Sequence, residues 1–202
     1  MQVIKIVPKV FASNCYLLTA DGENAVAIDP SVPAVLEEAA RRNLTIRYVL
    51  LTHGHFDHIG GCAALQAAGA KVGCLEKERA LALGKDNLGE LFSCMVPPFS
   101  VDFTFQDEDT LALCGLNIRV LSTPGHTAGS CCYLCEDAMF TGDTLFCGAV
   151  GRTDLPTSDG AALARSLRKL KALAGDYTLY AGHGEDSTLE GERTRNPYLK
   201  SC

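Results

Sequence analysis

The run Thr52-His-Gly-His-Phe-Asp-His58 constrains this chain more than any other stretch, because it gathers imidazoles and a carboxylate in one short segment. The apolar residues before it, 46–51, predict a buried strand, and residues 60–68 after it predict a helix. The cluster is therefore expected in the loop between a strand and a helix, where side chains can converge. Such a donor set suits a divalent metal such as zinc. The candidate ligands in this run are His53, His55, Asp57 and His58.

The chain has five histidines, so only His126 and His183 lie outside this cluster. Each stands in a glycine-flanked loop directly after a predicted strand, as the cluster does, and Asp143 follows another predicted strand in the same way. Glycines beside these residues permit the sharp turns and close backbone approach that a compact site needs. We therefore expect all of these side chains to meet at one edge of the sheets.

Composition places the chain among ordinary globular proteins. Its 202 residues, 47% hydrophobic and 21% charged, predict a single domain over residues 1–202. The 18 basic and 24 acidic residues give a net charge of −6 without a long block of either sign, which argues against nucleic-acid or anionic-membrane partners and favours a small-molecule substrate. We find no export signal and no run of about 20 apolar residues, so a cytoplasmic location is expected.

The ten cysteines are expected to be free thiols, because a chain without an export signal should stay in a reducing compartment. Cys131, Cys132 and Cys135 lie in a strand-like run without a second pair at zinc-finger spacing, which favours packing over metal binding. Cys147 follows Asp143 closely and is a candidate lining residue of the pocket. No histidine is left to activate it as a nucleophile.

The hydrophobic pattern predicts two groups of strands, each accompanied by helices, and this favours a layered α/β fold. Residues 8–13 are expected to connect the first two strands, in an antiparallel opening of the chain. Residues 75–98 predict one helix and then an irregular segment, a candidate wall of the substrate cleft. The predicted strands are 2–7, 14–20, 25–29, 46–51, 70–74, 101–105, 110–113, 116–121, 131–135, 138–141 and 177–180. The predicted helices are 34–42, 60–68, 160–173 and 187–194.

Five separated motifs, in order, resemble those of the metallo-β-lactamase superfamily. They are Asn14-Cys-Tyr-Leu-Leu18, Thr52-His-Gly-His-Phe-Asp-His58, Pro124-Gly-His-Thr127, Thr141-Gly-Asp-Thr-Leu-Phe146 and Gly182-His-Gly184. Within that superfamily the chain is most similar to the glyoxalase II group of hydroxyacylglutathione hydrolases, given the Thr-Leu-Phe after Asp143 and the ending Glu192-Arg-Thr-Arg-Asn-Pro-Tyr-Leu199. The resemblance implies a four-layer αββα sandwich, with two mixed sheets inside and helices outside.

The resemblance also implies a metal-dependent hydrolase with two divalent ions, with zinc expected and iron or manganese as alternatives. One ion would be held by His53, His55 and His126, the second by Asp57, His58 and His183, with Asp143 between them. Two ions about 3.5 to 4 Å apart can share a water and lower its pKa toward neutrality. The hydroxide would attack the carbonyl of a 2-hydroxy acid thioester, with Asp57 helping to orient it, and a thiolate leaves without a general acid.

The loop after Asp143 departs from the glyoxalase II pattern. Arg152 stands where those enzymes have a lysine that holds glutathione, and Asp154 stands where they have a tyrosine. Arg152 is the candidate contact for an anionic thioester, but glutathione itself is left open as the thiol. Residues 151–154 also resemble persulfide dioxygenases, in which two histidines and an aspartate, here His53, His126 and Asp143, hold one iron. A non-catalytic metal-binding module is the third alternative, whereas Asp143 and the missing export signal argue against a lactamase.

Overall fold

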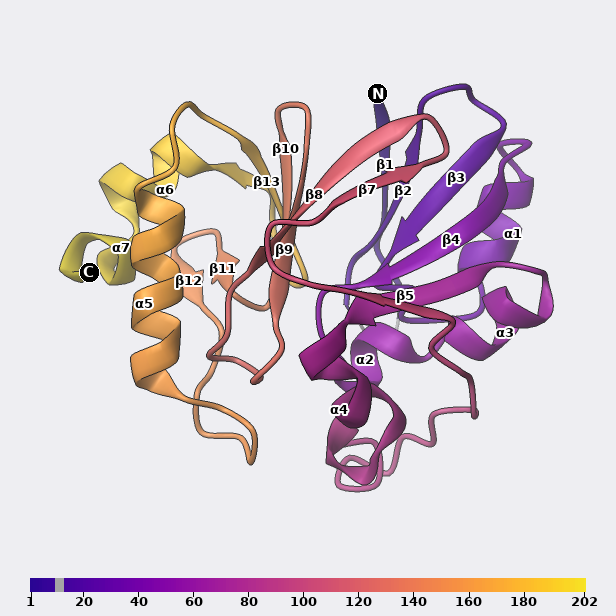
Figure 1. The fold of residues 1–202 in the computed structure, drawn as a ribbon, viewed down its shortest axis with the longest axis horizontal. Helices are drawn as coiled ribbons and strands as arrows, with labels where there is room; N and C mark the ends of the chain where they lie inside the picture. The colour runs from indigo at the N-terminus through magenta and orange to yellow at the C-terminus, as the bar shows by residue number, and fades with distance from the viewer. Residues whose placement is uncertain (10–12) are drawn as a thin grey trace.

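The computed structural model describes residues 1–9 and 13–202, so part of the expected connection over residues 8–13 lies outside the described residues. The described chain forms four layers, with two sheets in the middle and helices on both outer sides (Figure 1). This arrangement is the αββα sandwich that the sequence predicts. No helix in the described part of the chain combines the length and apolar character needed to cross a membrane.

The first sheet has six strands in the order of the chain. Its first three strands are antiparallel neighbours, and β3 to β6 run parallel, so the sheet is mixed. The antiparallel opening is therefore as predicted. The strands are β1 (Gln2–Ile6), β2 (Cys15–Thr19), β3 (Asn24–Ile28), β4 (Thr45–Leu51), β5 (Lys71–Leu75) and β6 (Phe103–Phe105).

The second sheet also has six strands, in the order β14-β13-β10-β9-β8-β7. All neighbours are antiparallel except β10 and β13. As a consequence β8, β10 and β13 run in the same direction, and their carboxyl ends lie at the same edge. The strands are β7 (Thr110–Leu113), β8 (Leu116–Ser122), β9 (Cys131–Cys135), β10 (Ala138–Gly142), β13 (Thr178–Ala181) and β14 (Ser187–Thr188).

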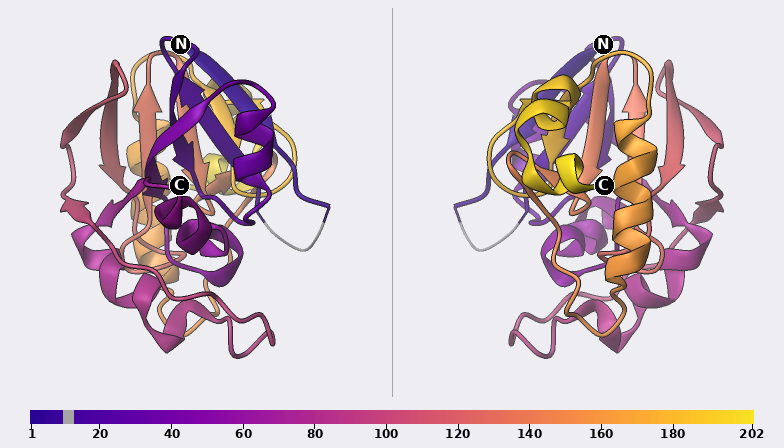
Figure 2. Two further views of the ribbon diagram at one scale, coloured as in Figure 1. Left: turned by 90° about the vertical axis from the view of Figure 1, so that its right-hand side faces the viewer. Right: turned by 90° about the vertical axis from the view of Figure 1, so that its left-hand side faces the viewer.

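Helices cover the outer face of each sheet, as the two side views in Figure 2 show: α1 and α3 lie over the first sheet, and α5 lies over the second. Asp159 caps α5 by accepting hydrogen bonds from the backbone N–H groups of Ala161 and Ala162. The helices are α1 (Val35–Ala40), α2 (Phe56–Ile59), α3 (Cys62–Ala67), α4 (Arg79–Leu83), α5 (Gly160–Lys171), α6 (Leu189–Arg195) and α7 (Pro197–Ser201), with short 3₁₀ turns at η1 (Glu76–Glu78) and η2 (Lys85–Asn87).

Three hydrophobic cores fill the spaces between these four layers. Successive side chains of a strand point to opposite faces, so in β2 Leu17 packs toward the helices while Tyr16 packs between the sheets. Burial on both faces explains why this strand reads as a continuous apolar run. In β9 the same rule buries Cys131 and Cys132 in different cores, which agrees with the expectation that these thiols are packing residues.

A small hairpin, β11 (Leu145–Phe146) and β12 (Ala149–Val150), follows β10 and was not predicted. The short helices α2 and α7 were also missed, because each spans only about one turn and carries no clear periodicity. The irregular segment over residues 84–100 lies at the lower end of the molecule in Figure 1, beside α4. These irregular pieces surround the edge where the candidate ligands meet.

Candidate metal centre

Every candidate ligand follows the carboxyl end of a strand, as the sequence indicates. His53 and His55 leave β4, and Asp57 and His58 lie in α2 directly behind them. Across the interface between the sheets, His126 follows β8, Asp143 follows β10 and His183 follows β13. Because those three strands run the same way, their loops face the loop after β4, and the side chains converge.

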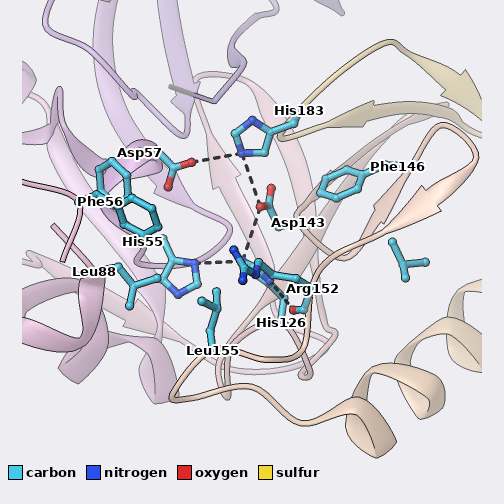
Figure 3. Close-up of a pocket in the computed structure, with 12 residues that line it drawn as sticks. His55, Phe56, Asp57, Leu88, His126, Asp143, Phe146, Arg152, Leu155 and His183 are labelled. Carbon is cyan, nitrogen blue, oxygen red and sulfur yellow. Dashed lines mark hydrogen bonds and ion pairs between the residues drawn. The ribbon is translucent and has the colours of Figure 1, made fainter. Parts of the chain in front are cut away.

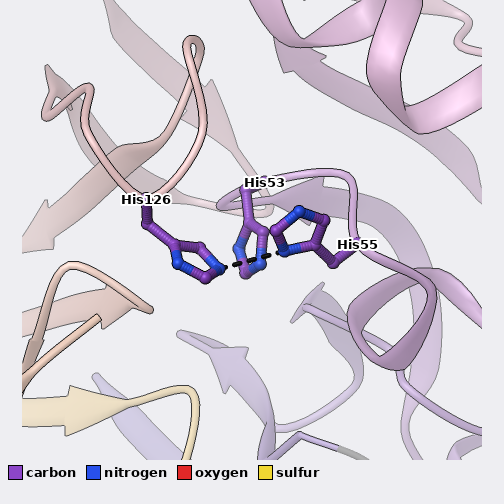
Figure 4. Close-up of side chains that lie close together, drawn as sticks. All are labelled: His53, His55 and His126. Atoms are coloured by element: carbon purple, nitrogen blue, oxygen red, sulfur yellow. Dashed lines mark hydrogen bonds between the residues drawn. The ribbon is translucent and has the colours of Figure 1, made fainter. Parts of the chain in front are cut away.

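The first group of ligand atoms comes from His53, His55 and His126 (Figure 4). One nitrogen from each ring lies within 4.8 Å of the others, and His55 Nδ1 is 3.0 Å from His126 Nε2. All three histidines are buried, with at most 3% of their surface exposed. Three imidazole nitrogens around one point form a ligand set typical of zinc and iron sites.

The second group consists of Asp57, His58 and His183, whose ligand atoms also lie within 4.8 Å of one another. Asp57 Oδ2 is 3.2 Å from His183 Nε2 and 3.9 Å from His58 Nε2. His58 is fully buried, whereas the side chain of His183 is 37% exposed. Among the ligands of this group, His183 is therefore the most open to solvent.

Asp143 lies between the two groups. Its Oδ1 is 3.3 Å from His58 Nε2 in the second group, and its Oδ2 is 3.5 Å from both His126 Nε2 in the first and His183 Nε2 in the second. Such a close approach requires a glycine at position 182, because a Cβ there would lie 2.2 Å from Asp143 Oδ1. One carboxylate thus faces both groups with its two oxygens.

Buried polar atoms without partners test whether a metal fits this centre. Within the described residues, His53 Nε2 is buried and makes no hydrogen bond, and the buried His58 Nε2 and Asp143 Oδ1 meet only as an ion pair at 3.3 Å. Such groups cost free energy unless something pairs with them, and here they point into the space between the imidazoles and carboxylates. The donor set and its unpaired atoms therefore fit divalent cations.

The protonation states of His53, His55 and Asp143 also fit cations. Burial, together with the neighbouring imidazole of His58, holds the pKa of His53 well below its ordinary value, and burial beside His126 lowers the pKa of His55 to about 3. Burial would raise the pKa of Asp143, but the neighbouring His58 outweighs it and keeps that pKa below the usual range. Neutral imidazoles and an ionised carboxylate are the forms that bind metals.

Asp29, which the sequence reading missed, orients His58. Its Oδ2 is 2.9 Å from His58 Nδ1, while both of its carboxylate oxygens also accept hydrogen bonds from Thr52. The Nδ1–H of His58 donates to this carboxylate, which leaves Nε2 free for a ligand role. Burial would lower the pKa of His58, but Asp143 and Asp29 outweigh it and raise that pKa. The sequence feature that could have pointed to Asp29 is its position at the end of β3, just before Pro30.

Glu78, at the end of η1, is a second buried residue that the sequence reading missed. Its side chain is 1% exposed, and its Oε1 accepts a hydrogen bond of 2.8 Å from the backbone N–H of Gly54, between two ligands. A Cβ on Gly129 would lie 2.5 Å from its Oε2, so the carboxylate also touches the loop that carries His126. Burial raises the pKa of Glu78 to about 7. Glu78 therefore bridges two ligand-bearing loops.

A cavity of about 400 Å³ opens over the centre (Figure 3). Arg152 is on its wall, but its guanidinium forms a two-pronged ion pair with Asp154, at 2.6 Å and 2.8 Å. The backbone carbonyl of Arg152 lies 2.9 Å from His126 Nδ1. Cys147 is exposed at the hairpin turn and is not among the described residues that line the cavity, contrary to expectation. The irregular segment does supply a wall, through Leu88 and Phe92, as predicted.

The fold and this centre define a class of protein. Residues 8–183 match the family described as the metallo-beta-lactamase superfamily, so the chain belongs to that superfamily of metallo-hydrolases. The resemblance inferred from the five motifs is thereby confirmed.

Individual relatives match the chain over almost its whole length. It is 36% identical to the hydroxyacylglutathione hydrolase GloC of Haemophilus influenzae, over 98% of each chain. The crystal structure of the BLEG-1 B3 metallo-beta-lactamase superposes with a TM-score of 0.89 at 32% identity, over 98% of this chain and 99% of that one. The crystal structure of TTHA1623 in a di-iron-bound form gives 0.85 at 31% identity, over 98% and 100%.

Proposed function

We propose that this protein is a binuclear metal-dependent hydrolase of thioesters of 2-hydroxy acids. The observation that carries the proposal is Asp143, whose two oxygens face both groups of ligand atoms beneath an open cavity. A purely structural metal site is normally closed by its protein ligands, whereas a catalytic one keeps room for water and substrate. The name of the Haemophilus relative supports the hydroxyacyl thioester as the substrate class.

Each ligand has an assigned role in the proposal. His53, His55 and His126 would hold one ion, Asp57, His58 and His183 the other, with Asp143 shared. When bound, two divalent ions would activate water and polarise a carbonyl oxygen, and we favour zinc, with iron supported by the di-iron relative. Asp57, which lines the cavity, is also assigned to orient the attacking water. The departing thiolate needs little protonation, because the pKa of a thiol is only about 8.5.

Arg152 is proposed to bind an anionic group of the substrate at the rim of the cavity. Its side chain is 57% exposed and its partner Asp154 is 68% exposed, and solvated ion pairs of this kind contribute little to stability. A substrate carboxylate can therefore replace Asp154 in the planar fork of the guanidinium at small cost. Arg152 would then recognise charge without touching the scissile bond.

The persulfide dioxygenase is kept as an alternative activity, and one relative adds a second alternative that the sequence alone argued against. Residues 151–154 resemble persulfide dioxygenases, which would need one iron on His53, His126 and Asp143 and would leave the second group unused. The name of the BLEG-1 relative supports β-lactam hydrolysis, which the same centre could perform on a strained amide. The proximity of the second group favours the two-ion hydrolase over the dioxygenase.

A substrate comparison tests the proposal. Purified protein is expected to hydrolyse S-lactoyl thioesters, to lose activity on treatment with a chelator and to regain it with zinc. The same samples are assayed with β-lactams and, by oxygen uptake, with a glutathione persulfide. Oxygen uptake by iron-loaded protein without thioester cleavage would replace the proposal with the dioxygenase, and β-lactam cleavage alone would replace it with the lactamase.

A further inference from the structure

Apolar side chains form the cavity walls around the metal ligands. Phe56 lies on the side of Asp57 and His55, and Phe146 lies on the opposite side, near His183 (Figure 3). The walls outside the ligand set also include Leu88, Phe92, Val150 and Leu155. A carbonyl placed at the centre would thus have an apolar wall on each side, whichever way the substrate lies.

Aromatic contacts give these walls a defined shape. The rings of Phe56 and Phe92 stack with centroids 5.2 Å apart and planes 25° from parallel. On the other side, the ring of Phe146 is 6.2 Å from that of His183 in an edge-on arrangement. Phe92 is nevertheless 45% exposed, so part of its surface remains available to a bound molecule. Flat, partly exposed aromatic faces favour aliphatic or aromatic groups.

The scarcity of charged side chains on the walls also favours apolar groups. Among the described residues that line the cavity, Arg152 is the one cationic side chain outside the metal ligands, and its side chain is at the solvent-exposed rim. A carboxylate or peptide group held between Phe56 and Phe146 would lose water without gaining a partner from these walls, which is costly. Glutathione carries both kinds of group close to its sulfur.

We infer that the site selects thioesters whose leaving thiol is aliphatic or aromatic, in preference to glutathione thioesters, and that Phe92 and Phe146 set this preference. The inference rests on the proposed thioesterase activity. A remote anionic group of such a substrate would lie at the rim of the cavity, where Arg152 is. The walls would bind the thiol because contact with them removes its apolar surface from water.

The test compares S-lactoyl esters of benzyl mercaptan and glutathione at equal concentrations. We expect kcat/KM to be at least about tenfold higher for the benzyl ester, in the range that hydrophobic pockets achieve. Preference for the glutathione ester would overturn the inference and leave the proposed function intact. Cleavage of neither ester would remove the proposed function, and the inference with it.

Substitutions of wall residues test whether the walls set the preference for an apolar thiol. Phe92→Ala is expected to lower kcat/KM roughly tenfold for the benzyl ester and much less for the ester of methanethiol, whose thiol has a single carbon to contact the wall. Leu91→Ala is the matched control, because Leu91 is adjacent, 71% exposed and outside the described lining of the cavity. Equal effects of the two substitutions would exclude a specific role for Phe92.

Two further measurements guard against a folding artefact. Phe146→Ala alters the opposite wall and is expected to reduce discrimination between the benzyl and glutathione esters to a similar extent. Calorimetric binding of a benzyl thioether analogue, which cannot be hydrolysed, should weaken roughly tenfold in Phe92→Ala and not in Leu91→Ala. Unchanged binding in both wall variants would overturn the inference independently of turnover.

Discussion

Arg152 and Asp154 form the ion pair at the rim of the cavity, and their substitution should have opposite effects on substrate binding. Arg152→Ala should raise KM for an anionic thioester about fivefold to 150-fold, with kcat nearly unchanged. Asp154→Asn should lower that KM, because the guanidinium loses its competing partner. Steady-state kinetics on charged and neutral thioesters check both effects.

A neutral thioester is the control, since it has no group for the guanidinium to bind. Equal loss on charged and neutral esters after Arg152→Ala would make the arginine a structural residue. The backbone carbonyl of Arg152 lies beside His126 Nδ1 whatever the side chain is, so the alanine variant should keep this contact. Unchanged kinetics on both esters would remove Arg152 from the site.

At the scale of elements, the β11–β12 hairpin depends on the C-terminal helices. Asn196 Nδ2 donates to the carbonyls of Ala149 and Phe146 at 3.1 Å and 3.4 Å, and its Oδ1 caps α7. Because Asn196 is fully buried, Asn196→Ala leaves several buried polar groups unpaired. We expect unfolding free energy to fall by about 2 to 4 kcal/mol, measured by urea denaturation.

Thr194→Ala is the matched control for this prediction, because Thr194 is exposed in the same C-terminal region and bonds only to the backbone of its own helix. Its effect should stay within about 0.5 kcal/mol. If Asn196→Ala were as mild as the control, the hairpin would not depend on this contact.

The same elements show what the sequence could and could not predict. Strands β4 and β10 contain buried apolar runs, and β8 and β13 alternate buried with more exposed residues. All four end in polar loops, so these strands and the ligands after them could be predicted. The β11–β12 hairpin has strands of two residues, too short for any periodicity, yet it carries Phe146 into the cavity. Asp29 and Glu78 act through contacts with distant segments, and only the position of Asp29 at the end of β3 gave a local signal.

At the scale of the whole molecule, Glu78 should make stability depend on pH. Burial raises its pKa from 4.5 to about 7, so the folded protein keeps a proton that the unfolded chain releases between those values. Stability of the metal-free protein should therefore fall as pH rises through this window, by at most about 3 kcal/mol from this group. Urea unfolding of chelator-treated protein across the window measures the effect.

Glu78→Gln should remove this contribution, so that the wild type loses stability relative to the variant as pH rises from 4.5 to 7, after which their difference stays constant. Glu76→Gln is the control, because Glu76 is exposed in the same turn. An identical pH dependence in the wild type and both variants would contradict the prediction and place the titrating group elsewhere.

The central claim is that Asp143 unites two metal sites in one catalytic centre, and the number of ions retained per chain tests it most directly. Elemental analysis after dialysis should find about two divalent ions in the wild type and one or fewer in Asp143→Asn, because an amide cannot neutralise two dications. Asp154→Asn, which changes an exposed carboxylate outside the centre, should retain as many ions as the wild type. Thioester turnover should be lost in Asp143→Asn alone. Two retained ions and full turnover in Asp143→Asn would contradict the account.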